Sequence, residues 1–262
     1  MSKLTVILPC FNEEPNIGEC LESVKWADEI MVVDSGSTDR TVEIARRYTG
    51  RILVHKYVNS AAQKNWAIPR AAGEWVMVID CDERATGELQ EEIRRLMAAG
   101  PSHDGYYIRR RNYFLGKRIK RCGWERDRVL RLFRRDKGRY ADRAVHADVE
   151  LDGKAGELAG FLEHYTYRSL DQYFEKFGRY TKWGAEDAFK RGTRAGALSL
   201  IFRAPLRFLK MYVFQLGFLD GFAGLVLCAL AAFSVFAKYA RLWALQNGLD
   251  DPARTQGMKG ER

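Results

Sequence analysis

The chain reads Val76-Met77-Val78-Ile79-Asp80-Cys81-Asp82-Glu83, where an apolar run ends directly in three carboxylates. The run is rich in β-branched residues and predicts a buried strand, so Asp80 and Asp82 would lie at its carboxyl end. A hard divalent cation such as Mg²⁺ or Mn²⁺ prefers oxygen ligands and is commonly held by one or two carboxylates together with substrate phosphates. The Asp-x-Asp spacing therefore predicts a cation site. The alternative is an acidic turn that caps the next helix.

A second strand end carries a similar signal in Val32-Val33-Asp34-Ser35-Gly36-Ser37-Thr38-Asp39. Asp34 can accept a hydrogen bond from a base or a sugar, and Gly36 lets a ligand approach the backbone closely. The alternative is a plain turn between a strand and a helix, in which Asp39 faces the helix dipole.

Strands and helices are predicted to alternate around these two stretches. Strands are expected at 4–8, 29–33, 52–55 and 75–79, and helices at about 17–24 behind an Asn12 N-cap, 37–48, 61–72 and 89–97, the last closed by Gly100-Pro101. Such alternation indicates βαβ units and an α/β fold with a mainly parallel sheet. Ligands of such sheets bind at the carboxyl ends of the strands, where Asp34 and Asp80 fall.

Composition excludes several classes of protein. A chain of 262 residues, 47% hydrophobic and 29% charged, is long enough for one core with an appendage and is not disordered. Its five scattered cysteines fit neither a disulfide framework nor a structural zinc site, and the first residues do not fit a secretory signal, so we expect a reducing compartment. The glycine-rich fingerprints of dinucleotide-binding and P-loop enzymes are absent from the sequence.

The net charge of +9 comes from one segment, 109–139, which holds 14 basic residues against three acidic ones. A nucleic acid, an anionic membrane surface or a phosphorylated substrate would each suit such a segment.

The C-terminal third is unusually apolar. Leu170, Tyr173, Phe174 and Phe177 predict a core-facing helix. The stretch 211–237 contains Asp220 as its only charge, and basic residues flank it on both sides: Arg203, Arg207, Lys210, Lys238 and Arg241. Basic flanks prefer the cytoplasmic side of a membrane, so both ends of the stretch should lie on that one face. We therefore expect a shallow or re-entrant helical hairpin that bends at Asp220-Gly221. A single membrane crossing and a soluble helix pair are the alternatives, and the tail from 247 is expected to be loose.

Three stretches, taken in order, resemble family 2 glycosyltransferases of the GT-A fold: Leu8-Pro9-Cys10-Phe11-Asn12-Glu13-Glu14, the Asp34 turn and the Asp80–Glu83 run. Further stretches resemble the bacterial branch that includes the lipopolysaccharide core β-glucosyltransferases: Ala62-Gln63-Lys64-Asn65-Trp66-Ala67, Gly73-Glu74-Trp75, Leu130-Arg131-Leu132-Phe133-Arg134-Arg135, Val145-His146 and His164-Tyr165-Thr166-Tyr167. The likeness extends over nearly the whole chain.

The resemblance implies a nucleotide-sugar-binding half at 1–100, an acceptor-binding half at 101–168, a helical membrane-associating region at 169–246 and a tail at 247–262. It also implies a role for each matching residue: Pro9, Asn12 and Glu13 would line the nucleotide pocket, Asp34 would hold the base, Asp80 would contact the ribose or diphosphate, and Asp82 would bind the metal ion. Lys64 and Arg84 are further candidates for contacts to the diphosphate.

The general base is open at this stage. Relatives in this branch typically read Val-His-Glu, whereas this chain reads Val145-His146-Ala147-Asp148, and alanine cannot take a proton. The role of deprotonating the acceptor hydroxyl is therefore open to Asp148, Asp127 or His146. On a strand, the one-residue shift to Asp148 would turn its side chain to the opposite face.

Arginine side chains match phosphate oxygens, so Arg109, Arg111 and Arg131 are expected to bind a phosphorylated acceptor. The leading hypothesis is an inverting, metal-dependent transfer of a hexose, with glucose as the expected sugar, from a UDP-sugar to an anionic glycolipid. That acceptor would be a lipid-linked glycan such as the lipopolysaccharide inner core, at the cytoplasmic face of the bacterial inner membrane. A polyprenyl-phosphate, capsule or exopolysaccharide transferase is the alternative within the class. An inactive membrane scaffold and a basic nucleic-acid-binding protein are the alternatives outside it, and no nucleic-acid partner is expected.

Overall fold

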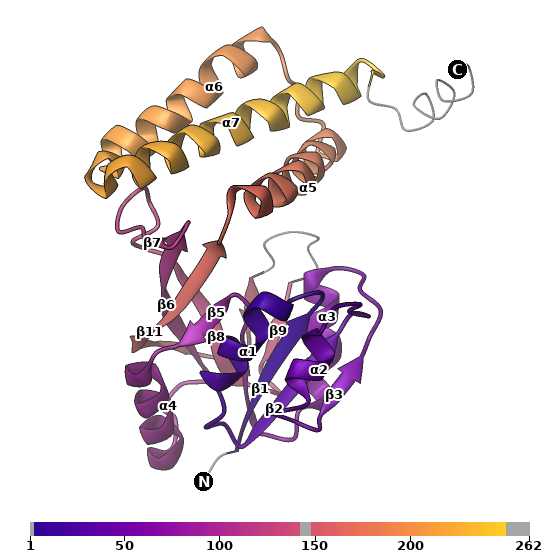
Figure 1. Cartoon of the computed structure of the whole chain (residues 1–262), viewed down its shortest axis with the longest axis vertical. Coiled ribbons are helices and arrows are strands. Elements are labelled where there is room, and N and C mark those ends of the chain that lie inside the picture. The colour runs from indigo at the N-terminus through magenta and orange to yellow at the C-terminus, as the bar shows by residue number, and fades with distance from the viewer. Residues whose placement is uncertain (1–2, 142–147, 250–262) are drawn as a thin grey trace. The chain divides into compact units, whose positions relative to one another are not determined.

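The computed structural model describes residues 3–141 and 148–249. The chain divides into two compact units (Figure 1). The sheet unit comprises Met1–Asn112 and Arg126–Thr166, and the helical unit comprises Tyr113–Glu125 and Tyr167–Arg262. The short excursion Tyr113–Glu125 thus belongs to the helical unit, although the residues on both sides of it belong to the sheet unit.

The sheet unit is built on one sheet with the strand order β3-β2-β1-β4-β8-β6-β11-β5. Its strands are β1 (Leu4–Cys10), β2 (Glu29–Asp34), β3 (Ile52–Val54), β4 (Trp75–Val78), β5 (Glu83–Ala85), β6 (Gly105–Phe114), β8 (Arg128–Arg134) and β11 (Ala155–Tyr167). The predicted parallel pairing is confirmed for β1 to β4. It does not continue beyond them, because β8 pairs antiparallel with both β4 and β6, and the sheet is therefore mixed. A separate hairpin joins β9 (Gly138–Tyr140) to β10 (Val149–Leu151).

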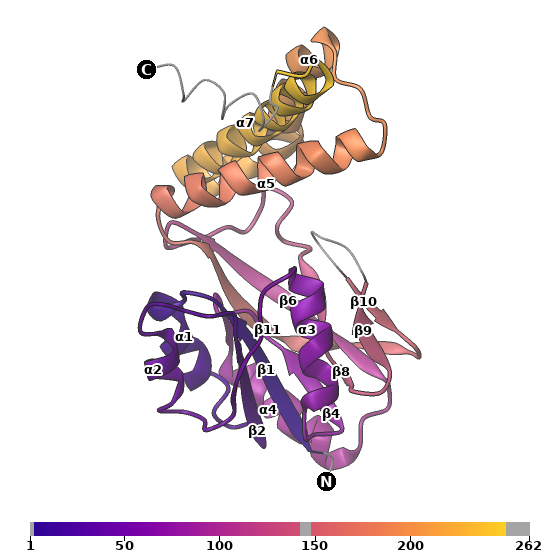
Figure 2. The ribbon, with the colours of Figure 1, turned by 90° about the vertical axis from the view of Figure 1, so that its right-hand side faces the viewer.

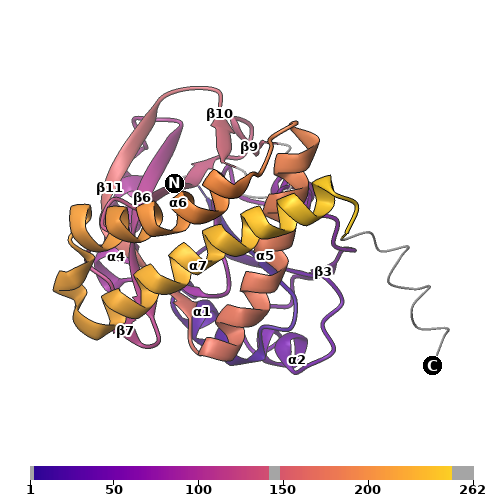
Figure 3. The same cartoon turned by 90° about the horizontal axis from the view of Figure 1, so that it is seen from above.

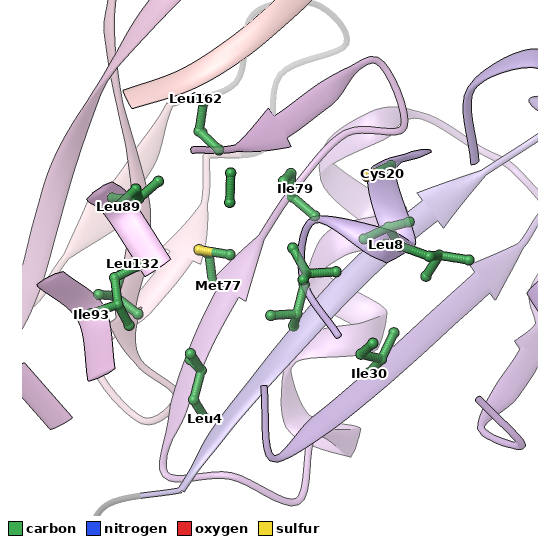
Figure 4. Close-up of a cluster of buried hydrophobic side chains, with 14 of the residues drawn as sticks. Leu4, Leu8, Cys20, Ile30, Met77, Ile79, Leu89, Ile93, Leu132 and Leu162 are labelled. Atoms are coloured by element: carbon green, nitrogen blue, oxygen red, sulfur yellow. The ribbon is translucent and has the colours of Figure 1, made fainter. Parts of the chain in front are cut away.

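The core follows the alternation of side chains along each strand. Val6 and Leu8 of β1 face one cluster, which α1 (Glu14–Glu22) and α4 (Gly87–Ala99) cover, and Figure 4 shows its side chains. Ile7 faces a second cluster on the other side, which α3 (Ser60–Ala67) and the 3₁₀ turn η1 (Ile68–Arg70) cover (Figure 2). Burial on both faces explains why the strands read as continuous apolar runs in the sequence.

Two local predictions are wrong. Asn12 is not an N-cap: Glu13 occupies that position, and Asn12 has a φ of 52°, which turns its side chain toward the neighbouring loop. The helix expected at 37–48 is only α2 (Thr41–Ala45): before it, the Ser37 hydroxyl donates to Asp34, and the Asp39 carboxylate accepts the N–H of Thr41 at the start of the helix. The predicted end of α4 is confirmed, since Gly100 follows the helix with a φ of 83°.

The helical unit holds α5 (Leu170–Lys190), α6 (Ala197–Leu209), the π-helical turn η2 (Lys210–Phe214), the 3₁₀ turn η3 (Gly217–Asp220), α7 (Gly221–Gln246) and the two-residue strand β7 (Lys117–Arg118). Helix α7 packs against both α5 and α6 (Figure 3). The chain reverses at η3, where Leu216 and Gly221 have φ values of 55° and 63°. The helical hairpin therefore bends where the sequence predicts it.

The hairpin exposes much of its apolar surface. None of the 13 residues of α6 is buried, and Leu198, Ile201, Phe202, Leu206 and Leu209 are all exposed. Within the described ranges, one helical stretch, Gly217–Gln246, is long and apolar enough to cross a membrane by length and composition.

Candidate active site

The loops that follow β1 and β2 are tied to one another. The backbone N–H of Asn12 donates to Ser37 Oγ (2.9 Å), and the N–H of Thr38 donates to Asn12 Oδ1 (2.8 Å). The N–H of Glu13 donates to Thr41 Oγ1 at 2.7 Å. Pro9, near the carboxyl end of β1, accepts the Sγ–H of Cys81 on its carbonyl at 3.5 Å. The structure thus brings Pro9, Asn12 and Glu13 to one end of the sheet, beside the Asp34 turn.

Asp34 ends β2 and is 3% exposed. Its carboxylate accepts the N–H groups of Gly36 (2.9 Å) and Ser37 (3.1 Å) and the hydroxyl of Ser37 (2.5 Å). Gly36 can complete this turn because its φ is 90°, which glycine adopts without strain. The carboxylate therefore shapes the loop, and its role toward a base stays a prediction.

Asp80 is held by two cations. Its Oδ1 lies 2.9 Å from Lys64 Nζ, and its Oδ2 lies 2.5 Å from a guanidinium nitrogen of Arg131. Burial alone would raise the pKa of Asp80, but the charges of Arg131 and Lys64 outweigh it and hold the pKa well below its usual range. Asp80 is thus an ionised acceptor at neutral pH, and 37% of its side chain remains exposed.

Glu83 and Arg131 form a buried ion pair beneath Asp80. The same Arg131 nitrogen lies 2.8 Å from Glu83 Oε1, and the two side chains are 6% and 0% exposed. The other oxygen of Glu83 accepts the backbone N–H of Asp80 at 3.0 Å, so Glu83 also fixes the turn after β4. Arg131 is predicted from the sequence to bind the acceptor, but its guanidinium is engaged in the interior.

Asp127 is engaged in the same way. Arg110 donates to both of its oxygens at 2.9 Å, and Asn112 Nδ2 donates to Oδ2 at 2.8 Å. Burial would raise the pKa of Asp127, but the bonds and charge of Arg110 lower it instead. A carboxylate so stabilised is a poor proton acceptor.

Of the other two candidates for the base, only Asp148 lies in the described part of the chain. Asp148 directly precedes β10, is exposed, and accepts the N–H of Ala141 on its backbone carbonyl at 2.9 Å. His146 lies outside the described residues.

Asp82 faces His164. Strand β11 pairs with β5 so that His164 lies opposite Glu83, and the N–H of Tyr165 donates to the Asp82 carbonyl at 2.9 Å. This pairing places His164 Nε2 3.6 Å from Asp82 Oδ2, with both side chains largely buried. On its other side, His164 Nδ1 lies 2.6 Å from Asn112 Oδ1.

A cation at this position would have two protein ligands, Asp82 and His164. In the part of the chain that is described, no group of three or more acidic, histidine or cysteine side chains is arranged to hold a metal ion. Glu83, Arg110, Asn112 and His164 are absent from the site predicted from the sequence. The separation of His164 from Asp82 in the chain explains its omission, although its His-Tyr-Thr-Tyr stretch carries part of the family resemblance.

The remaining predicted residues lie elsewhere in the sheet unit. Arg84 donates to the carbonyls of Cys81 (2.6 Å) and Asn16 (2.8 Å) and so braces the loop after β4. Arg109 and Arg111 stack on the ring of Phe161, 4.6 and 3.9 Å from its centroid. Since neighbouring residues of a strand face opposite sides, these two arginines face away from the side of β6 on which Arg110 contacts Asp127.

Comparison with known proteins places this geometry in a family. The family model described as "Glycosyl transferase family 2" matches residues 5–149. The chain is 31% identical over 251 residues to the lipopolysaccharide core biosynthesis glycosyltransferase LpsC of Rhizobium meliloti (strain 1021), with 90% of this chain and 93% of that protein covered. It is 30% identical over 257 residues to an uncharacterised glycosyltransferase of Rickettsia typhi, with 92% and 87% covered. Among solved structures, S. aureus TarS 1–349 in complex with UDP aligns with a TM-score of 0.48 at 16% identity, over 94% of this chain and 92% of that one. The chain therefore belongs to glycosyl transferase family 2 and has the GT-A fold.

Proposed function

We propose that this chain transfers a hexose, with glucose as the expected sugar, from a UDP-sugar to a phosphorylated lipid-linked glycan, with inversion at the anomeric carbon. The Asp82–His164 pair beside the ionised Asp80 carries this proposal. A carboxylate beside an imidazole can contribute to the binding of a divalent cation, which the phosphates of a nucleoside diphosphate would share. The extensive similarity to LpsC, a lipopolysaccharide core biosynthesis enzyme, supports the class of acceptor.

Asp82 and His164 fit a divalent cation. One carboxylate oxygen and one imidazole nitrogen, 3.6 Å apart, supply part of a coordination shell that diphosphate oxygens and water would complete. A mixed oxygen and nitrogen set favours a transition ion such as Mn²⁺ over Mg²⁺. When bound, the cation neutralises the negative charge that develops on the departing nucleoside diphosphate.

The residues around this pair would bind and orient the donor. The half-exposed Asp80 carboxylate is kept ionised by Lys64 and Arg131 and can accept hydrogen bonds from ribose hydroxyls. Pro9, Asn12, Glu13 and Asp34 lie at the ends of β1 and β2, where nucleotides bind in sheets of this kind. Lys64 can add positive charge beside the diphosphate.

Asp148 is the proposed base that removes the proton from the attacking hydroxyl. Its carboxylate is exposed, whereas Asp127 is bound by Arg110 through two hydrogen bonds and by Asn112 through a third. An exposed carboxylate can approach an acceptor and take its proton.

The helical unit is proposed to attach the protein to the cytoplasmic face of the inner membrane. The exposed apolar side chains of α6 and the length of Gly217–Gln246 support this attachment.

The test is a panel of UDP-sugars assayed for hydrolysis and for transfer to lipid-linked glycans, with and without Mn²⁺. We expect Mn²⁺-dependent activity with one donor and its loss in Asp82→Ala, with folding retained. Asp136→Ala is the matched control because Asp136 is an exposed aspartate of the same unit. Full activity of Asp82→Ala, or activity that excess chelator leaves unchanged, would contradict the proposal.

A further inference from the structure

A continuous chain of hydrogen bonds runs from Arg110 through Asp127 and Asn112 to His164. Arg110 donates twice to Asp127, Asn112 joins Asp127 at 2.8 Å, and the other end of the Asn112 amide lies 2.6 Å from His164 Nδ1. Asn112 is 3% exposed, so water does not compete for these bonds. The Asn112 amide thus connects the Asp127 carboxylate to the His164 ring.

The orientation of the Asn112 amide follows from Asp127. A carboxylate that receives both hydrogen bonds of a guanidinium fork is ionised and offers only acceptor atoms. The group of Asn112 that faces it must therefore be the NH₂, and the carbonyl oxygen must face His164. The reverse orientation would set two acceptors against each other at 2.8 Å.

The same reasoning fixes the proton on His164. A carbonyl oxygen 2.6 Å from Nδ1 can only accept, so Nδ1 carries the hydrogen. In the neutral ring, Nε2 then has a free lone pair. That lone pair lies on the side of Asp82, 3.6 Å from its Oδ2.

The opposite tautomer would lose the hydrogen bond at Nδ1 and gain none at Nε2. A hydrogen on Nε2 would face Asp82 Oδ2 across 3.6 Å, too far for an N–H···O bond. It would also leave two acceptors opposed at Nδ1. The Thr166 hydroxyl, 3.2 Å from Nδ1, can donate or accept and so does not select either tautomer.

We propose that Arg110, Asp127 and Asn112 form a positioning relay that locks His164 in its Nδ1–H tautomer and so presents the Nε2 lone pair, together with Asp82, to a divalent cation. The cation is part of the proposed function on which this inference rests. The relay gives a role to the two hydrogen bonds from Arg110 to Asp127. Outer partners of this kind orient metal-binding histidines and raise their basicity.

The tautomer can be measured directly and without metal or donor. The chain has four histidines, so ¹⁵N-histidine labelling of the full-length protein in detergent gives few signals, and His164→Gln assigns the one of interest. We expect the wild-type His164 signal to show a protonated Nδ1 and an unprotonated Nε2 at neutral pH. A protonated Nε2 would overturn the proposal.

Three variants test the relay itself. Asn112→Leu removes the acceptor, and Asp127→Asn removes the charge that orients the Asn112 amide without touching His164. We expect both to shift His164 toward the Nε2–H form, whereas Thr166→Val should leave it on Nδ1. The His55 ring, bonded to Gln63 at 2.7 Å, reports whether each variant is folded. A folded Asn112→Leu protein with unchanged His164 signals would overturn the relay.

Mn²⁺ binding provides the second readout. Electron paramagnetic resonance of free Mn²⁺, titrated with protein and UDP, should show affinity lowered about 10- to 100-fold in Asn112→Leu and Asp127→Asn and unchanged in Thr166→Val. Equal affinity in all folded variants would overturn the link between the tautomer and the cation. An Nδ1–H wild-type His164 that binds no Mn²⁺ would instead refute the proposed metal-dependent transfer, while the tautomer relay would stand.

Discussion

The two units of this protein each depart from the usual rule that charged side chains are exposed and apolar side chains are buried. The sheet unit buries charge: Glu83 is 0% exposed, and Lys64, Arg84 and Arg131 are each at most 7% exposed. The helical unit exposes apolar side chains such as Leu198, Phe214 and Phe222, which are 72%, 80% and 77% exposed. Buried charges persist only when they are mutually compensated, and large apolar surfaces persist only when something covers them. The comparison supports the proposals that the sheet unit binds an ionic ligand and that the helical unit contacts a membrane.

The largest expected effect comes from breaking the buried charge network. Arg131→Met removes the cation between Asp80 and Glu83, so that the fully buried Glu83 keeps only the longer contact to Arg110 at 3.3 Å among its described ion pairs. We expect the free energy of unfolding of the sheet unit to fall by about 3 to 5 kcal/mol. Hydrogen exchange of amides in β4 and β8 measures this change. Arg134→Met on the same strand is the control, because Arg134 is exposed and pairs only at the surface with Asp136, and it should change stability by less than about 1 kcal/mol.

Acid should weaken the same network to a smaller extent. The pKa values of Asp80 and Asp127 are lower in the folded protein than in the unfolded chain, where aspartate titrates near about 3.9. Their stabilising contribution is therefore complete above that value and is lost as the pH falls through the folded pKa values. We expect constant stability of the sheet unit from neutral pH to about pH 5 and a decline below about pH 4, measured by denaturant unfolding. A stability that rises on acidification would contradict the assignment of these carboxylates.

A third test concerns the exposed surface of α6. Phe202→Ser replaces an exposed phenylalanine that we expect to enter the membrane interface. Loss of part of one apolar side chain should weaken binding to anionic vesicles by about 1 to 2 kcal/mol, roughly five- to thirtyfold, in a sedimentation assay. Val54→Ser is the matched control, since Val54 is 73% exposed on β3 of the sheet unit. If both variants bound equally well to vesicles, α6 would not be the membrane-facing surface.

The smallest expected effect is on stability, and it tests most directly whether the apolar surface of α6 lies outside any core. The same Phe202→Ser variant should change the free energy of unfolding by no more than about 0.5 kcal/mol, because the side chain is not part of a core. Thermal unfolding in detergent-free buffer measures this. Destabilisation comparable to that of Arg131→Met would show that Phe202 packs inside the protein.

The parallel half of the sheet could be predicted from the sequence because its signals are local. Apolar runs that end in Asp34 and Asp80 mark β2 and β4, and the periodicity of Leu89, Ile93 and Met97 marks α4. The spacing of the two acidic strand ends also predicted that they lie at one edge of the sheet. These inferences depend only on residues within one element and its neighbours along the chain.

The antiparallel half depends on long-range register and could not be predicted in this way. Met77 of β4 lies opposite Leu132 of β8, and this pairing turns Arg131 into the interior instead of toward an acceptor. Likewise, the pairing of β5 with β11 brings His164 to Asp82. The exposed face of α6 did carry a local signal, in the spacing of Leu198, Phe202, Leu206 and Leu209. This signal is hard to recognise because Arg203 and Arg207 interrupt it and resemble the basic flanks of the apolar segment that follows.

The excursion Tyr113–Glu125 has a consequence for anyone who wishes to make this enzyme freely soluble. Its Phe114, Ile119 and Cys122 share a core with Tyr173, Met211 and Leu227, and the N–H groups of Lys120 and Arg121 donate to Asp220 at 3.0 and 2.8 Å. A stop codon after β11 would remove all of those later partners. The apolar side chains of the excursion would then be exposed in the middle of the remaining polypeptide. Removing the residues after β11 is therefore not enough. A water-soluble version also requires a short polar linker in place of the excursion. Two changes to the gene are thus needed: a truncation after β11 and an internal replacement.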